Sequence, residues 1–252
     1  MKERNQNMLQ KFYCRISAAV LAGLLMTMTG CDNQKRPVPD YNESSKVIAL
    51  TFDDGPNTNT TPEILDILEK YGVVASFFVI GNNVTEETAP IVKRAYDLGC
   101  EINNHSLTHS NMTGFDEAEL LSEIQQTSDK VQKITGEPTY FFRPPYIAVD
   151  GDMFTTIELP FICGYGVNDY DNKVTADARY EGVMEAAEDG AIILLHDMYG
   201  NDKTVEAVDR LIPDLLEQGY VFVTVSQLFD AKGIEPKSGI VYTFAEQTGM
   251  YR

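Results

Sequence analysis

Short apolar runs alternate along the chain with segments in which apolar residues recur every three or four positions. The runs are rich in β-branched and aromatic residues, which predicts buried strands. They cover residues 47–52, 73–80, 100–103, 140–143, 161–167, 191–196 and 220–225. The segments between them predict amphipathic helices, one opening at Thr61 and others over residues 86–98, 116–134, 175–188 and 203–217. Asp116 and Glu119 have the spacing of a capping box at the start of the longest helix.

This alternation of strands and helices indicates an α/β fold with a largely parallel sheet covered by helices. The strand count favours a barrel-like arrangement in one domain over residues 46–231. Residues 232–252 show no clear pattern and are expected to form a C-terminal tail.

The first 31 residues have the pattern of a lipoprotein-type signal peptide. Basic residues precede an almost uncharged apolar run over residues 16–30, which is short for a spanning helix of about 20 residues. The run ends at Met28-Thr29-Gly30-Cys31, which resembles a bacterial lipobox; an uncleaved anchor and ordinary cleavage nearby are the alternatives. We therefore expect export, a lipid anchor at Cys31 as the only membrane attachment, and a polar tether over residues 32–45.

The chain is strongly acidic, with a formal net charge of −18 and a pI near 4.4. Nucleic-acid binding needs a basic surface, so the composition argues against that class of function. No metal-binding cysteine spacing is present. Cys100 and Cys163 lie in apolar stretches, a pattern that fits either two buried thiols or a disulfide between them. We expect no disulfide and a monomer.

All three histidines lie in two short motifs, His105-Ser106-Leu107-Thr108-His109 and Leu194-Leu195-His196. Two histidines four positions apart face one side of the chain and can bind a divalent metal together with one carboxylate. This spacing alone is a weak signal, and Ser106 stands where the metalloprotease helix motif requires glutamate. Asp53-Asp54-Gly55-Pro56 adds two adjacent acids, although Asp-Gly-Pro is also common in turns.

Arg143-Pro144-Pro145-Tyr146 places a cation on a stiff segment. Two adjacent carboxylates repel each other unless a nearby cation offsets their charge. A histidine at the end of a strand can serve as a general acid. Each of these features alone is often structural. The candidates share a position at or just after the C-terminal end of a predicted strand; they are Asp53, Asp54, His105, Arg143, Asp171 and His196. Active sites of α/β barrels sit at that end, so the sequence predicts a metal-assisted hydrolase.

Together these segments resemble the polysaccharide deacetylase family, also called the NodB-homology domain or carbohydrate esterase family four, over about residues 47–231. The motifs are Thr51-Phe52-Asp53-Asp54-Gly55-Pro56, His105-Ser106-Leu107-Thr108-His109, Arg143-Pro144-Pro145-Tyr146 and Leu194-Leu195-His196. The resemblance implies a distorted β/α barrel in which Asp53 is the catalytic base and Arg143 orients it. It assigns the metal to Asp54, His105 and His109. It also implies that the Tyr146 backbone amide binds the oxyanion, that His196 is the acid, and that Leu194 lines the acetyl pocket.

The fourth motif departs from the family pattern of Asp-x-x-Asp-Trp. Here the stretch reads Asn168-Asp169-Tyr170-Asp171-Asn172, and the chain contains no tryptophan. This alignment makes Asp171 the acid that supports His196. The missing tryptophan removes the expected aromatic contact with sugar, and Ile147 replaces a common glycine, so the groove is expected to differ.

The resemblance implies one divalent metal ion, with Zn²⁺ expected first and Co²⁺, Ni²⁺ or Mn²⁺ as alternatives. It implies removal of N-acetyl groups from a polysaccharide, and the expected export points to peptidoglycan N-acetylglucosamine. Chitin oligomers, another exopolysaccharide and acetylxylan are alternative substrates. Two other classes compete: an iron oxygenase, which usually carries an H-x-D pair, and a catalytically silent glycan-binding relative.

Overall fold

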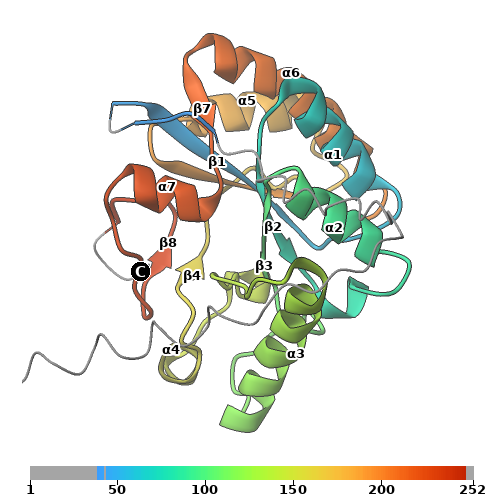
Figure 1. The fold of residues 1–252 in the computed structure, drawn as a ribbon, viewed down its shortest axis with the longest axis vertical. Coiled ribbons are helices and arrows are strands. Elements are labelled where there is room, and N and C mark those ends of the chain that lie inside the picture. The colour runs from blue at the N-terminus through green and yellow to red at the C-terminus, as the bar shows by residue number, and fades with distance from the viewer. Residues whose placement is uncertain (1–38, 43, 248–252) are drawn as a thin grey trace, which may run out of the picture. The chain divides into compact units, whose positions relative to one another are not determined.

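Strand β1 (Lys46–Asp53) is central to the sheet of this computed structural model, which describes residues 39–42 and 44–247 (Figure 1). Along one edge it pairs with β6 (Ala191–His196). Along the other, β7 (Tyr220–Phe222) pairs with its first residues and β2 (Ser76–Val79) with its last. β3 (Glu101–Asn104) lies beyond β2, and β5 (Tyr165–Gly166) lies beyond β6. All these ladders are parallel, which confirms the predicted α/β architecture.

The remaining strand contacts are short. Phe142 bridges Asn104 at the end of β3 to Phe161 in β4 (Phe161–Ile162), and β4 pairs with β8 (Val241–Tyr242). Ala191 then bridges Phe244, which follows β8. These single bridges replace continuous ladders, so the sheet curves as an irregular barrel.

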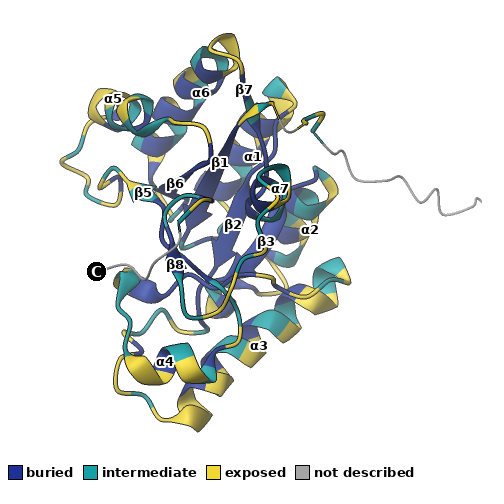
Figure 2. Cartoon of the chain, turned by 90° about the vertical axis from the view of Figure 1, so that its left-hand side faces the viewer, coloured by how far each residue is buried: buried dark blue, intermediate teal, exposed yellow. Residues whose placement is uncertain are grey.

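Seven α-helices and two short 3₁₀ turns accompany the strands within the described residues. They are α1 (Thr60–Tyr71), α2 (Ala89–Asp97), α3 (Glu117–Thr135), α4 (Gly151–Thr156), α5 (Ala176–Ala186), α6 (Asp202–Glu217) and α7 (Val225–Ala231), with 3₁₀ turns η1 (Gly81–Asn83) and η2 (Pro145–Ile147). α5 packs on α6, α6 on α1, α1 on α2 and α2 on α3. The capping box predicted for Asp116 and Glu119 is present at α3. Figure 2 shows buried strands and helices whose outer faces are exposed.

Alternation along β1 separates two apolar layers. Ile48, Leu50 and Phe52 pack in the cluster beneath the helices, whereas Val47 and Ala49 face a second cluster that includes α7 and Tyr242. Successive side chains of a strand point to opposite faces. Odd-numbered residues of β1 therefore point into the barrel, and Asp53 is the last of them.

Three predicted segments differ from the structure. Residues 140–143 contribute only the Phe142 bridges, because two prolines follow Arg143 and remove ladder donors. The run over 161–167 divides into β4 and β5 at Gly164, which has a positive φ of 90°. The chain beyond Ala231 adds β8 and buries Tyr242 and Ala245, so the packed core continues past the predicted end of the domain.

Cys100 and Cys163 are free and buried. The helices within the described ranges are all too short or too polar to cross a membrane. The predicted signal peptide, Cys31 and most of the tether lie outside the described residues.

Candidate active site

Asp53 and His196 lie directly opposite each other at the ends of β1 and β6. Leu194 lies two positions before His196, so both side chains leave β6 on the same face. Asp53 is an odd-numbered residue of β1, so its side chain also points into the barrel. Strand pairing alone thus brings an acid and an imidazole to one mouth of the barrel.

Strained backbone gathers at this mouth. The non-glycine residues with positive φ within the described ranges are Asp54, Ser106, His109, Tyr146, Ile147 and Asn168. Five of the six belong to the motifs identified in the sequence, and Ile147 directly follows one of them. Such conformations cost about 1–3 kcal/mol each and persist where the surroundings enforce them. The loops that carry the functional side chains are therefore held in fixed, unusual shapes.

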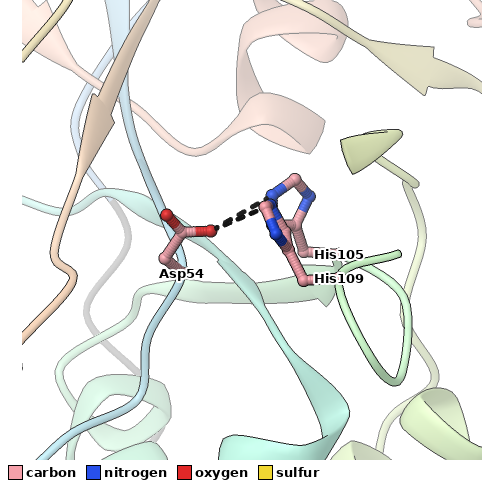
Figure 3. A group of neighbouring side chains, drawn as sticks. All are labelled: Asp54, His105 and His109. Carbon is pink, nitrogen blue, oxygen red and sulfur yellow. Dashed lines mark ion pairs between the residues drawn. The ribbon is translucent and has the colours of Figure 1, made fainter. Parts of the chain in front are cut away.

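Asp54, His105 and His109 converge at one point (Figure 3). Asp54 Oδ1 lies 3.5 Å from His105 Nε2 and 3.3 Å from His109 Nε2. The Nδ1–H of His105 donates to the Arg143 carbonyl oxygen at 2.7 Å, which leaves Nε2 free as a ligand. Burial and the neighbouring charge of His105 lower the pKa of His109, which favours the neutral imidazole that metals bind.

These donors fit a divalent metal. Asp54 Oδ1 is buried and accepts no hydrogen bond within the described part of the chain. A buried carboxylate oxygen without a donor is costly, and a cation between it and two imidazoles would remove that cost. Two nitrogens and one oxygen are also the donor types that Zn²⁺ and its neighbours in the series accept.

The loop between the two histidines is anchored from α3. Glu123 is buried and accepts the backbone N–H groups of Leu107 and Thr108 at 2.8 and 2.9 Å. The Ser106 hydroxyl accepts the His109 N–H at 2.9 Å. These bonds fix the turn that sets the direction of both imidazoles.

Arg143 is fully buried and binds Asp53, with 2.5 Å between Nη1 and Oδ1. Its Nε donates to the Ile162 carbonyl oxygen, and its guanidinium lies 4.0 Å from the centre of the Phe78 ring. Asp53 Oδ2 points the other way and lies 3.8 Å from His105 Nε2. One carboxylate oxygen is thus held by arginine, and the other faces the histidine cluster.

Asp169, and not Asp171, supports His196, so the predicted alignment of this motif was wrong. Asp169 Oδ1 accepts the Nδ1–H of His196 at 2.7 Å, and Oδ2 accepts its backbone N–H at 2.8 Å. The chain turns at Asn168, where φ is 54°, and the Asp171 N–H closes that turn on the Asn168 carbonyl. The Asp171 carboxylate consequently points away from the site and accepts the Lys173 N–H.

The environment of His196 favours its charged form. Burial opposes protonation, but the hydrogen bond and charge of Asp169, with the charges of Asp53 and Asp54, outweigh it and raise the pKa to about 9. Since the folded-state pKa exceeds the ordinary 6.5, this group stabilises the fold below about pH 6.5. The contribution is lost as the pH rises through about 9.

Asp169 is itself part of a buried network that the sequence did not reveal. The Thr204 hydroxyl donates to Asp169 Oδ2 at 2.7 Å, and Nη1 of Arg179 donates to Thr204 at 2.8 Å. Arg179 also donates to the Asn201 side chain and to the Asp171 carbonyl. No motif marks Arg179 or Thr204 in the sequence; only a charged residue on the apolar side of α5 gives a signal.

Asp197 is a second residue that the sequence analysis did not assign. It is fully buried, accepts the Gly55 N–H and the Thr61 hydroxyl, and donates its own N–H to the Asp53 carbonyl. A Cβ at Gly55 would collide with this carboxylate. Asp197 thus ties the loop after β1 to the end of β6, and Gly55 is the residue that permits the close approach.

A pocket of about 580 Å³ connects these groups. Its floor includes Leu194, Cys163, Gly164 and Gly166, and Tyr146 stands at its rim with 69% of its surface exposed. No acceptor for the Tyr146 N–H is found among residues 44–247. The structure therefore brings together every residue predicted for the site except Asp171.

Replacing Asp169 with asparagine should lower the pKa of His196 towards its ordinary value, since the charge that offsets burial is lost. The pKa is measurable by NMR because the chain has only three histidines. Asp171→Asn is the matched control and should leave the pKa of His196 close to that of the wild type. A larger shift in Asp171→Asn than in Asp169→Asn would restore the alignment predicted from the sequence.

Comparison with known proteins identifies the family. The family model described as polysaccharide deacetylase matches residues 40–159. A bifunctional xylanase/deacetylase of Pseudobutyrivibrio xylanivorans is 47% identical over 77% of this chain and 32% of that protein. The peptidoglycan-N-acetylmuramic acid deacetylase PdaC of Bacillus subtilis is 39% identical over 79% of this chain and 41% of that protein. The chain thus spans less than half the length of these two relatives.

A solved structure matches most of this chain. The family 4 acetyl xylan esterase from Clostridium thermocellum, in complex with a cobalt ion, has a TM-score of 0.78 and is 38% identical, covering 80% of this chain and 100% of that one. Together with the family model, this similarity shows that the chain belongs to the polysaccharide deacetylase family, carbohydrate esterase family four.

Proposed function

We propose that this protein is a metal-dependent deacetylase that hydrolyses N-acetyl groups of a cell-envelope polysaccharide, with peptidoglycan N-acetylglucosamine as the first candidate. The observation that carries the proposal is the position of Asp53, held by Arg143, opposite His196, held by Asp169, beside Asp54, His105 and His109. A protein that only bound glycans would have no use for a paired base and acid at one mouth.

Asp54, His105 and His109 would hold the metal, with Zn²⁺ the first expectation. Bound there, a divalent cation supplies Lewis-acid polarisation of the acetyl carbonyl and lowers the pKa of water. The cobalt ion in the acetyl xylan esterase from C. thermocellum supports a divalent ion of this series.

The protein groups divide the proton transfers between two sides of the acetyl group. Asp53, held in place by Arg143, takes a proton from the attacking water. The Tyr146 N–H faces the developing oxyanion. His196, protonated because of Asp169, gives its proton to the leaving amine, so acetate and a free amine result. Leu194 with Gly164 and Gly166 forms the apolar recess that accepts the acetyl methyl.

The envelope location rests on the expected signal peptide and on relatives named as peptidoglycan deacetylases. Lipid anchoring at Cys31 is part of this proposal, and so is a monomeric protein. Nucleic acid is not an expected partner at a net charge of −18.

Acetylated xylan is a second candidate substrate, because two relatives named for xylan are 47% and 38% identical to this chain. An ester and an amide differ in the leaving group, an alkoxide in one and an amine in the other. The same base and oxyanion contacts serve both reactions.

Incubation of the protein with N-acetylglucosamine oligomers, peptidoglycan fragments and acetylated xylo-oligosaccharides should remove acetyl groups from one of these classes in mass spectrometry. A chelator should abolish the loss, and added Zn²⁺ should restore it. Asp97→Asn serves as a control, because Asp97 is an exposed residue of a surface ion pair with Lys93. If the metal-loaded protein leaves every acetylated glycan intact, the proposal fails.

A further inference from the structure

Exposed tyrosines surround the catalytic mouth. Tyr146, Tyr170 and Tyr199 are 69%, 57% and 74% exposed, and they lie on the loops after Phe142, β5 and β6. Tyr146 lies 4.8 Å from His109 and Tyr170 lies 5.6 Å from His196, measured between ring centres. Tyr146 and Tyr170 line the catalytic pocket, whereas Tyr199 does not.

Tyr199 lines a second pocket, of about 320 Å³, which meets the first at Asp54. Its walls come from the loop after β1 and the loop after β2. The lining side chains are mostly amides and hydroxyls, from Asn57, Thr58, Asn82, Asn83, Thr85 and Thr88. A polar pocket therefore continues the catalytic one on the other side of Asp54.

The backbone of this second pocket is held in place. Asn82 N–H donates to the Leu107 carbonyl in the histidine loop, and the Asn83 side chain donates to the Asp54 carbonyl. The Gly200 N–H, next to Tyr199, donates to Asn59 and Thr60 at 3.0 Å each. Pre-organised walls of this kind reduce the ordering cost of binding.

The ligand-facing groups, in contrast, are available. Within residues 44–247, neither the Asn82 amide nor the Tyr199 hydroxyl has a hydrogen-bond partner, and both side chains are exposed. An aromatic face beside free amide and hydroxyl groups suits a sugar ring, whose C–H face packs on the aromatic quadrupole while its hydroxyls bond at the edge. Glu87 at the pocket and the net charge of −18 disfavour an anionic sugar.

We infer that the pocket of Tyr199 and Asn82 is a subsite for a neutral sugar unit adjacent to the one that loses its acetyl group. This inference rests on the proposed function. It adds the direction in which the glycan chain binds: the chain passes over Asp54 and continues along the loop after β6. An oligosaccharide occupies both pockets, whereas a small acetate ester occupies the catalytic pocket alone.

Kinetics of Tyr199→Ala test the subsite. For the oligosaccharide that the wild type deacetylates, KM should rise about tenfold, which corresponds to about 1.4 kcal/mol. Hydrolysis of the aryl ester 4-methylumbelliferyl acetate should stay within twofold of the wild type. Tyr199→Phe retains the ring and should keep most of the affinity. Tyr140→Ala is the control, because Tyr140 is an exposed tyrosine that lines a pocket with Gly99 and Glu101 at the start of β3.

The outcomes separate this inference from the proposed function. An unchanged oligosaccharide KM in Tyr199→Ala, with an active wild type, overturns the subsite and leaves the deacetylase intact. An equal loss on the aryl ester also overturns it, because Tyr199 would then act on the catalytic centre. A wild type that hydrolyses the aryl ester but no glycan overturns the proposed function and the subsite together.

A binding measurement gives a readout without turnover. The chain lacks tryptophan, so Tyr199→Trp introduces a single tryptophan, whose emission can be excited selectively, into the pocket. In an Asp53→Asn background, in which turnover should be about 10²–10⁴-fold slower, N-acetylglucosamine tetramer or acetylated xylotetraose should shift its emission, with saturation. Tyr140→Trp in the same background should show no saturable shift. Equal responses from both variants, or no response from Tyr199→Trp while the tetramer binds by calorimetry, would place the glycan elsewhere.

Discussion

Replacing Asp53 with asparagine should lower kcat on the acetylated glycan by about 10²–10⁴-fold, the usual contribution of a general base. The amide of asparagine cannot take a proton from water, but its oxygen can still accept a hydrogen bond from Arg143. The buried guanidinium loses its counter-charge, so the free energy of unfolding should fall, by at most about 3–5 kcal/mol. Steady-state kinetics and thermal unfolding, measured on the same preparation, separate the two effects.

Metal content distinguishes a lost base from a lost metal site. Asp54, His105 and His109 are unchanged in Asp53→Asn, so bound metal measured by elemental analysis should stay at the wild-type ratio. Asp97→Asn removes the same formal charge from an exposed site and should leave kcat unchanged. Turnover of Asp53→Asn within tenfold of the wild type, with metal bound, would show that another group acts as base.

Apolar runs in the sequence predicted the strands that place Asp53. The apolar run that ends at Phe52 forms β1, and its alternation directs Asp53 into the barrel. The run over residues 191–196 forms β6 and places His196 opposite Asp53. Such continuous apolar runs are readable because burial on both faces of a strand restricts nearly every position to an apolar residue.

Turn geometry limited what the sequence could reveal in the fourth motif. Asp169 and Asp171 are two positions apart and would share a face in an extended strand. The positive φ of Asn168 turns the chain between β5 and α5. Asp169 therefore contacts His196, and Asp171 does not. A backbone conformation stabilised by tertiary contacts, here those of Arg179 with the Asp171 and Val174 carbonyls, leaves no periodic trace in sequence.

The C-terminal segment shows the same limit for long-range contacts. β8 has two residues, and its pairing with β4 joins positions 80 apart in register. The apolar run from Ile240 to Tyr242 is too short to give a pattern, yet Val241 and Tyr242 are almost fully buried. A strand as short as this one is determined by its contacts with distant residues and not by a pattern in its own sequence.

His196→Ala should separate amide from ester hydrolysis. An amine leaves as an anion only at prohibitive cost, so loss of the proton donor should lower kcat on an N-acetylated oligosaccharide by about 10²–10⁴-fold. A phenolate is a stable anion, so hydrolysis of 4-methylumbelliferyl acetate should fall far less. The metal should remain bound, because His196 is not one of the converging donors Asp54, His105 and His109.

The pH profile supplies a second readout for the same group. His196 must be protonated to act, and its pKa of about 9 means that kcat/KM of the wild type on the amide should fall as the pH rises through about 9. In Asp169→Asn this alkaline limb should move to lower pH, and in His196→Ala it should be absent from the residual activity. Near-normal amide turnover in His196→Ala, or an equal loss on amide and aryl ester, would contradict the assignment of His196 as the acid. A stronger dependence on His196 for N-acetyl than for O-acetyl glycans then follows from the leaving group alone, whichever polymer the protein meets.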